Sequence, residues 1–204
     1  EWKEKLIDIV ASSDDELAEL YLEGKEIPLE KLKSAIRKGT INRTFVPFVM
    51  GSARHNQGVQ PLIDAVIDYL PSPLDIPATK GMQIKKDKEE EIEVPCKENG
   101  MPVGLVFKIQ YDREMGSLCY VRMYSGKITA GTQVFNVGKK KRERVNRILR
   151  MHADKSEPMD SVSAGDIAVF IGLKLAQTGD TLGSEGLPVL LESVKFPEPV
   201  ISVA

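Results

Sequence analysis

The sequence has 204 residues, of which 42% are hydrophobic and 28% charged, and 28 basic against 30 acidic side chains give a net charge of −2. This composition is typical of a globular protein and excludes a generally basic nucleic-acid binder, so any basic surface must be local. No apolar run approaches the roughly 18 residues of a membrane helix, and no signal peptide is recognisable. Two isolated cysteines, Cys96 and Cys119, favour a reducing compartment.

The first part of the chain is predicted to be helical. Residues 1–11 form an amphipathic pattern that already begins at the first residue, which predicts that the chain is a piece of a longer protein. The S-x-x-E pattern of Ser13–Glu16 predicts that a second helix begins there, and Gly24 ends it. Pro28 begins a third helix, and Gly39 is its predicted C-terminal stop.

The stretch from Phe45 to Pro73 reads as a strand, a short polar turn and a helix. Phe45–Met50 has the length of a buried strand, and Pro47 favours an edge position because it cannot donate to the ladder. Gly51-Ser52-Ala53 follows, at the end of a strand where α/β folds bind ligands. Alternatively, it is only a tight turn. The predicted helix repeats apolar residues at helical spacing: Val59, Leu62, Ile63, Val66, Ile67 and Leu70.

The second part of the chain is predicted to be β-structure. Residues 71–81 carry three prolines and read as a stiff linker, and residues 82–93 read as an exposed, charge-rich approach to the next domain. From Val94 onwards, short apolar stretches alternate with glycine-containing turns, which favours a closed β-barrel. The six predicted strands are Val103–Tyr111, Ser117–Tyr124, Gln133–Val137, Val145–Met151, Ile167–Leu173 and Val189–Val194.

The sequence shows no recognisable catalytic or metal-binding motif. His55 and His152 have no nearby nucleophile or carboxylate partner, the two cysteines and two histidines lack zinc spacing, and no G-x-x-x-x-G-K-[ST] phosphate loop occurs. We therefore expect no catalytic residue, no metal site and no hydrolytic activity of this chain by itself.

One segment is strongly basic. It begins at Lys139, Lys140, Lys141 and Arg142, continues through Arg144, and extends to Arg147 and Arg150. In a strand, Arg142 and Arg144 point to the same side. A basic loop on a barrel suits contact with an RNA phosphate backbone, whereas the alternative is a solvated hairpin without a ligand.

Taken together, these patterns resemble bacterial-type elongation factor G, a family of translational GTPases. The resemblance covers nearly the whole chain and is carried by the following segments: Gly51-Ser52-Ala53, Gly58-Val59-Gln60, Asp64–Pro73, Phe107-Lys108-Ile109, Arg122–Gly126, Arg147–Ala153, Ala164–Ile167, Thr178–Leu182 and Pro197–Val200.

The resemblance implies a domain organisation. Residues 1–70 would be the C-terminal part of a P-loop GTPase domain of α/β fold, with helices, an edge strand and the end of a helical insertion. Residues 71–81 would be the linker, 82–194 an all-β translation-factor-type barrel and 195–204 the start of a third domain.

The resemblance also implies a function. The parent protein would bind and hydrolyse GTP with Mg²⁺ to promote movement of tRNA and mRNA on the ribosome, in the cytoplasm or an organellar matrix. Ser52 and Ala53 would form the last guanine-contact loop. The phosphate loop and switches lie upstream in the family, so GTP, GDP and Mg²⁺ are not expected to bind this chain alone.

The expected partners follow from the same resemblance. The barrel would touch small-subunit ribosomal RNA, with the seven basic residues as the contact candidates; the alternative for Arg147 and Arg150 is that they brace the barrel or its domain interface. The other partners would be the rest of the GTPase domain and the third domain, with no membrane, no DNA and a monomeric state. The alternatives to the whole assignment are a sister translational GTPase of the ribosomal-protection or termination type, or a stand-alone RNA-binding barrel.

Overall fold

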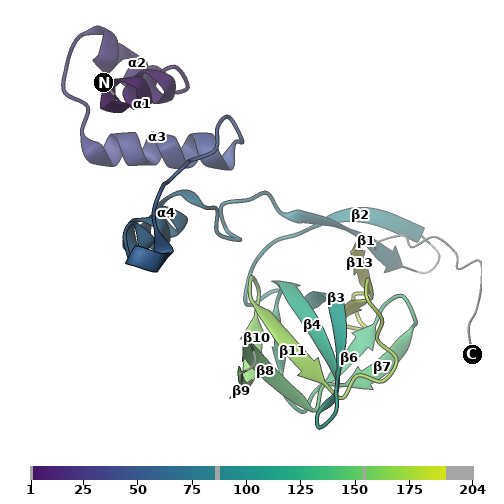
Figure 1. The fold of residues 1–204 in the computed structure, drawn as a ribbon. Helices are drawn as coiled ribbons and strands as arrows, with labels where there is room; N and C mark the ends of the chain where they lie inside the picture. The colour runs from purple at the N-terminus through teal and green to yellow at the C-terminus, as the bar shows by residue number, and fades with distance from the viewer. Residues whose placement is uncertain (1, 86–87, 154, 192–204) are drawn as a thin grey trace, which may run out of the picture. The chain divides into compact units, whose positions relative to one another are not determined.

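The structure, a computed structural model, describes residues 2–85, 88–153 and 155–191 and divides the chain into two compact units, Glu1–Ile76 and Pro77–Ala204 (Figure 1). The first unit is helical and the second consists of strands. The expectation of a helical part followed by an all-β barrel is confirmed. The predicted start of a third domain at residues 195–204 lies outside the described residues.

Four α-helices and one short 3-10 turn make up the regular structure that is described in the first unit. They are α1 (Trp2–Ala11), α2 (Asp15–Leu22), α3 (Leu29–Ile41), η1 (Ala53–His55) and α4 (Val59–Tyr69). The apolar faces of the first three helices meet in one small core: Val10, Ala11, Leu17, Leu32, Ala35 and Ile36. None of the helices in the described part of the chain is long and apolar enough to span a membrane.

Two helix boundaries differ from the prediction, each for a local reason. The N-cap of α2 is Asp14, whose side chain accepts a hydrogen bond from the Leu17 amide at 3.3 Å, whereas the Ser13 hydroxyl donates back to the Val10 carbonyl. Helix α3 runs past Gly39 to Ile41. Gly39 therefore lies inside the helix and is not its stop. Its missing Cβ makes room for the Phe45 ring, which a side chain at this position would overlap.

Polar contacts hold the end of α4 against α3. Arg37 donates to the carbonyls of Ile67, Asp68 and Leu70 at 3.3, 3.0 and 3.1 Å, and to the Asp75 carboxylate at 2.6 Å. These carbonyls belong to the last turn of a helix, where intrahelical partners are missing. One arginine therefore caps α4 and fixes the segment that follows it.

The strand predicted at Phe45–Met50 is wrong. These residues belong to no strand, and Val46, Phe48 and Met50 are 88%, 86% and 83% exposed. A strand needs a neighbouring strand to pair with, and the described residues of this unit offer none. Helix α4 forms as predicted, but it has no buried residue, so its apolar face is also exposed.

The second unit contains three antiparallel sheets within its described ranges. Strands β13 (Val189–Leu191), β1 (Thr79–Lys85) and β2 (Lys88–Val94) form one sheet in that order, and β10 (Ser161–Ser163) pairs with β5 (Lys127–Thr129). The largest sheet has the order β7-β6-β12-β3-β4-β11-β8-β9. Its strands are β3 (Val103–Asp112), β4 (Gly116–Ser125), β6 (Gln133–Asn136), β7 (Lys141–Arg144), β8 (Arg147–His152), β9 (Lys155–Met159), β11 (Ile167–Ile171) and β12 (Thr181–Gly183).

The large sheet curls around one apolar core. Its inward side chains include Val106, Val121, Met123, Ile148 and Phe170, all nearly inaccessible to solvent. Residues 145–146 carry the chain from the β7 end of the sheet to β8 near its other end: the Val145 carbonyl accepts from the Gly131 amide, before β6, at 2.7 Å, and the Asn146 amide donates to the Ile171 carbonyl of β11 at 2.8 Å. The sheet is therefore barrel-like.

All six predicted strands are present as β3, β4, β6, β8, β11 and β13, although residues 192–194 of the last one lie outside the described residues. The described residues of the charge-rich stretch 82–93 lie in strands β1 and β2, which the sequence does not predict, and β1 begins at Thr79 inside the predicted linker. The consecutive Glu89, Glu90 and Glu91 of β2 are all exposed, so both faces of the strand are solvated there, and β2 becomes buried only at Val94.

Candidate nucleic-acid interface

The basic segment forms an antiparallel hairpin at one edge of the large sheet. Strand β6 pairs with β7 from Gln133 opposite Arg144 to Asn136 opposite Lys141, and residues 137–140 make the turn. Lys140 has a left-handed backbone conformation with φ of 53°, which completes the turn. Lys139 and Lys140 therefore lie at the hairpin tip, and Lys141, Arg142 and Arg144 lie on its outer strand.

Alternation along β7 separates its charges. Arg142 and Arg144 are exposed, whereas Glu143 between them is 7% exposed. The Glu143 carboxylate accepts hydrogen bonds from the amides of Lys174 and Leu175, both at 2.7 Å. The single acid of the basic segment is thus a structural anchor that ties the hairpin to the loop after β11.

A second anchor holds the hairpin tip. Asn136 is fully buried, donates to the Asp180 carboxylate at 2.8 Å, and accepts from the Lys139 amide at 3.1 Å. The Lys139 ammonium forms an ion pair with Asp180 at 3.1 Å and also donates to the Leu175 carbonyl. The tip is therefore fixed before any ligand arrives.

These contacts divide the predicted basic residues into two groups. Lys139 is paired with Asp180, and Arg142 donates to Glu185, with its Nε at 2.7 Å. Lys140, Lys141 and Arg144 are exposed and form no ion pair within the described part of the chain. Unpaired exposed cations are the ones that a phosphate group can neutralise without first displacing a carboxylate.

Arg147 and Arg150 lie apart from this hairpin, on β8. Both are exposed, while Ile148 and Leu149 between them are buried. Neither arginine forms an ion pair among the residues that the structure describes, which speaks against the alternative that they brace the barrel through charge.

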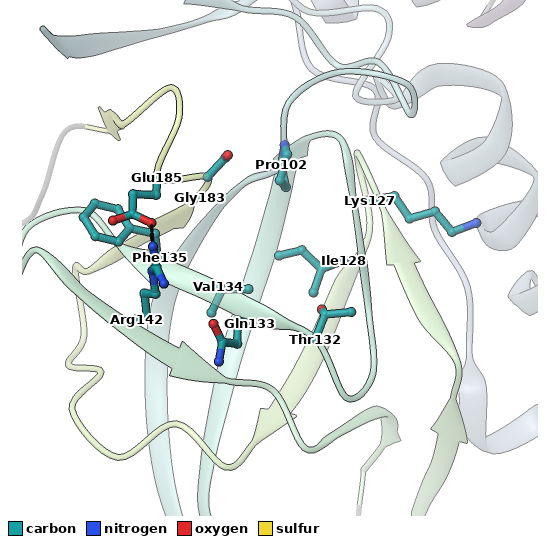
Figure 2. A pocket seen from close by; sticks show the side chains of 11 residues that line it. Pro102, Lys127, Ile128, Thr132, Gln133, Val134, Phe135, Arg142, Gly183 and Glu185 are labelled. Carbon is teal, nitrogen blue, oxygen red and sulfur yellow. Dashed lines mark hydrogen bonds and ion pairs between the residues drawn. The ribbon is translucent and has the colours of Figure 1, made fainter.

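A pocket of about 310 Å³ adjoins the hairpin where the short strand β12 ends (Figure 2). Its lining includes the apolar Pro102, Ile128 and Val134 and the polar Thr132 and Gln133. The Phe135 ring and the Arg142–Glu185 pair lie together on one side, while the Lys127 side chain extends away on the other (Figure 2). No sequence pattern signals this pocket, because several separate segments of the chain build its walls.

The predicted guanine-contact loop in the first unit is a closed turn. Ser52 and Gln57 exchange two main-chain hydrogen bonds of 2.8 and 3.0 Å, and η1 begins at Ala53. Gly51 and Gly58 allow this closure, because a Cβ on Gly51 would lie 2.7 Å from the Gln57 carbonyl oxygen. Ala53 is exposed and its main-chain amide has no hydrogen-bond partner in the described regions, so it is free to donate to a ligand.

Titratable side chains elsewhere do not form a recognisable centre. Cys96 and Cys119 are both free thiols, and burial, followed by the Glu143 and Asp180 carboxylates, raises the pKa of Cys119 to about 11. Among the described residues, no group of three or more His, Cys, Asp or Glu side chains is placed to hold a metal ion.

Comparison with known proteins identifies the class of this fold. Residues 101–185 match the family described as elongation factor G domain 2, so the barrel is a domain of that type. The chain is 66% identical to elongation factor G 1 of Treponema denticola and 54% identical to elongation factor G 2 of Treponema pallidum, in both cases over all 204 residues. It is 50% identical to elongation factor G of Thermotoga maritima over 202 residues.

The chain spans only about 30% of the length of these relatives. A solved structure from Thermus thermophilus has the same fold, with a TM-score of 0.65 and 21% identity over 97% of this chain and 27% of that one. The high identity to the curated relatives extends over both units, and the chain belongs to the elongation factor G family.

Proposed function

We propose that this chain supplies the ribosome-docking barrel of an elongation factor G and that the β6–β7 hairpin contacts small-subunit ribosomal RNA. The observation that carries the proposal is the set of three exposed, unpaired cations, Lys140, Lys141 and Arg144, on a hairpin that buried polar groups already fix. Arg147 and Arg150 extend the contact along β8, while Lys139 and Arg142 chiefly hold the hairpin in shape.

The physical basis is electrostatic. Each cation that neutralises a phosphate releases condensed counterions, which favours binding without any base-specific contact. RNA helices are recognised largely by shape and by their backbone, so a rigid row of cations is sufficient for docking. Fixing the hairpin in advance lowers the entropy that is lost when the side chains engage the RNA.

In the whole protein, GTP hydrolysis with Mg²⁺ would drive movement of tRNA and mRNA, and the hydrolytic residues would lie in segments outside this chain. The Ser52–Ala53 turn fits one part of that site, because the free Ala53 amide offers a donor for the guanine carbonyl and the closed loop holds it still. We therefore infer that this chain contributes to guanine recognition but has no GTPase activity alone.

The exposed apolar residues of the first unit support an intramolecular partner. Most of the apolar residues of α4 are exposed, as are Val46, Phe48 and Met50, and such exposure is unfavourable in water. We infer that the remainder of the GTPase domain covers these residues. A third domain would follow the barrel, and the protein would act as a monomer in the cytoplasm or an organellar matrix.

The proposal is tested by reversing charge on the hairpin. Lys140→Glu with Lys141→Glu should weaken binding of the chain to small ribosomal subunits by at least about tenfold, measured by co-sedimentation at low salt. The matched control reverses Lys80 and Lys97, two exposed lysines of the same unit outside the hairpin. Equal losses in the two double variants would show that overall charge, and not the hairpin, governs binding.

A further inference from the structure

The pocket beside the β6–β7 hairpin carries a more specific inference, which rests on the proposed function. We propose that it binds one unpaired nucleobase of RNA, stacked on Phe135 and the Arg142 guanidinium and hydrogen-bonded through the Gln133 amide. Lys141 and Arg144 would contact the phosphates on either side of that nucleotide.

The register of the hairpin brings these groups onto one face. Gln133 is opposite Arg144 and Phe135 is opposite Arg142, so the four side chains share the outer face of β6–β7, while Val134 and Glu143 occupy the buried face. Directly opposite residues of an antiparallel pair have their Cβ atoms about 5 Å apart. Gln133, Phe135 and Arg142 thus line the pocket, and Arg144 lies beside it on the same face of the hairpin.

The hydrogen-bonding state of the Gln133 and Arg142 side chains suits contact with a nucleobase. Gln133 is exposed, and its amide has no hydrogen-bond partner among the described residues, so both its donor and its acceptor are available for a base edge. Arg142 already donates through Nε to Glu185 at 2.7 Å, and this bond lies in the plane of the guanidinium. Glu185 therefore fixes the orientation of the guanidinium, and the Phe135 ring lies on the same side of the pocket (Figure 2).

The size and chemistry of the pocket favour a nucleotide within an RNA strand. Its volume of about 310 Å³ lies at the lower end of the range for small-molecule sites, which is roughly 300–1,000 Å³. Pro102, Ile128 and Val134 add apolar atoms to its largely polar wall, and these atoms can contact a base face. The pocket itself has no glycine-rich phosphate cradle, so the phosphate contacts would come from the neighbouring unpaired cations. Stacking requires an exposed base face, which only an unpaired nucleotide presents.

The test compares two RNA probes of equal charge. One is a fluorescent octamer of adenosines, and the other is the same ribose–phosphate chain without bases; binding of the 204-residue chain is followed by fluorescence anisotropy. The adenosine octamer should bind about tenfold more tightly than the abasic one, since stacking on an aromatic group contributes that much per base. Equal affinities would overturn the proposal.

Variants then test whether the preference for the adenosine octamer over the abasic chain arises at the pocket. Gln133→Ala and Phe135→Leu should each reduce the affinity ratio several-fold, and the double variant should bring it close to one. Gln133 is exposed, so its substitution leaves the fold intact, and thermal unfolding checks Phe135→Leu. The matched controls are Gln110→Ala and Tyr111→Leu, two exposed residues of β3 outside the pocket, which should leave the ratio unchanged. A ratio that falls in the β3 variants and not in the pocket variants would overturn the proposal.

The same assay separates this inference from the proposed function. Lys140→Glu with Lys141→Glu should lower the affinity for both octamers by a similar factor and keep their ratio. If the ribosome-binding test fails while the base preference persists at the pocket, the proposed docking is wrong and the pocket stands. If ribosome binding depends on the hairpin but the octamers bind equally, only the pocket inference is overturned.

Discussion

Replacing Glu143 tests whether its buried carboxylate anchors the basic hairpin to the loop after β11. Glu143→Ala removes the acceptor of two main-chain donors, the Lys174 and Leu175 amides, both 2.7 Å from the same carboxylate oxygen. Leaving a buried donor unsatisfied costs about 1–3 kcal/mol, so the two together predict a loss of about 3 kcal/mol in the free energy of unfolding of the barrel unit. Urea denaturation, followed by the circular dichroism of the barrel, measures this loss.

The conservative variant sharpens the prediction. Because both amides donate to one oxygen, the side-chain carbonyl of Glu143→Gln can accept both bonds, and only the 3.4 Å contact with the Asn136 amide is lost. We expect a cost of about 1 kcal/mol for this variant. If the alanine variant lost less than about 1 kcal/mol, or if glutamine were as costly as alanine, the assigned role of Glu143 as an acceptor would be refuted.

Three further predictions concern the rest of the chain. Gly126→Ala should cost the barrel at least about 2 kcal/mol in a denaturation assay, because φ is 70° and a Cβ would lie 2.6 Å from the Pro102 Cα; an unchanged midpoint would contradict this. Cys96 should react with iodoacetamide at about pH 8 in the native protein, while Cys119 should stay unlabelled until unfolding because of its burial and raised pKa. The hydrogen bond from Lys38 lowers the pKa of Asp14 below its ordinary value of 3.8. The ionised Asp14 carboxylate therefore contributes its full stabilisation above pH 3.8, and this stabilisation is lost as the pH falls below that value. The difference in thermal unfolding temperature between the unchanged chain and Asp14→Ala should therefore shrink in acid.

The barrel is predictable from the sequence because most of its strands carry local signals. Strands such as β3 and β11 combine β-branched residues with glycine-containing turns, and the core they form is contained in this unit. The short or charged strands carry no such signal, since β2 is mostly glutamate and β12 has three residues. Their pairing is set by the neighbouring strands, and their own composition carries little information.

At Phe45–Met50 the error is the opposite one: the sequence predicts a strand where the structure has none. The apolar composition of this segment predicts a buried strand, but Val46, Phe48 and Met50 are exposed, and the described part of the first unit offers no strand to pair with. Composition predicts burial, whereas pairing depends on residues that are far away in the sequence or in another segment of the whole protein.

The candidate interface is predictable only in part. The basic run identifies the hairpin, but it cannot separate the unpaired cations from Lys139 and Arg142, whose carboxylate partners come from distant loops. The buried position of Glu143 does have a signal, because Arg142 and Arg144 flank it and alternate residues of a strand share a face. The pocket has none, since distant segments build it.

The salt dependence of ribosome binding tests the central claim most directly. Each phosphate contact to RNA contributes about 0.7–0.9 to the slope of log K against log salt concentration, so substituting Lys140, Lys141 and Arg144 together with alanine should lower that slope by about 2 for binding to small ribosomal subunits. Alanine at Lys80 and Lys97 should leave the slope unchanged. A triple variant with the slope of the unchanged chain would contradict the account, because the hairpin would then make no phosphate contact.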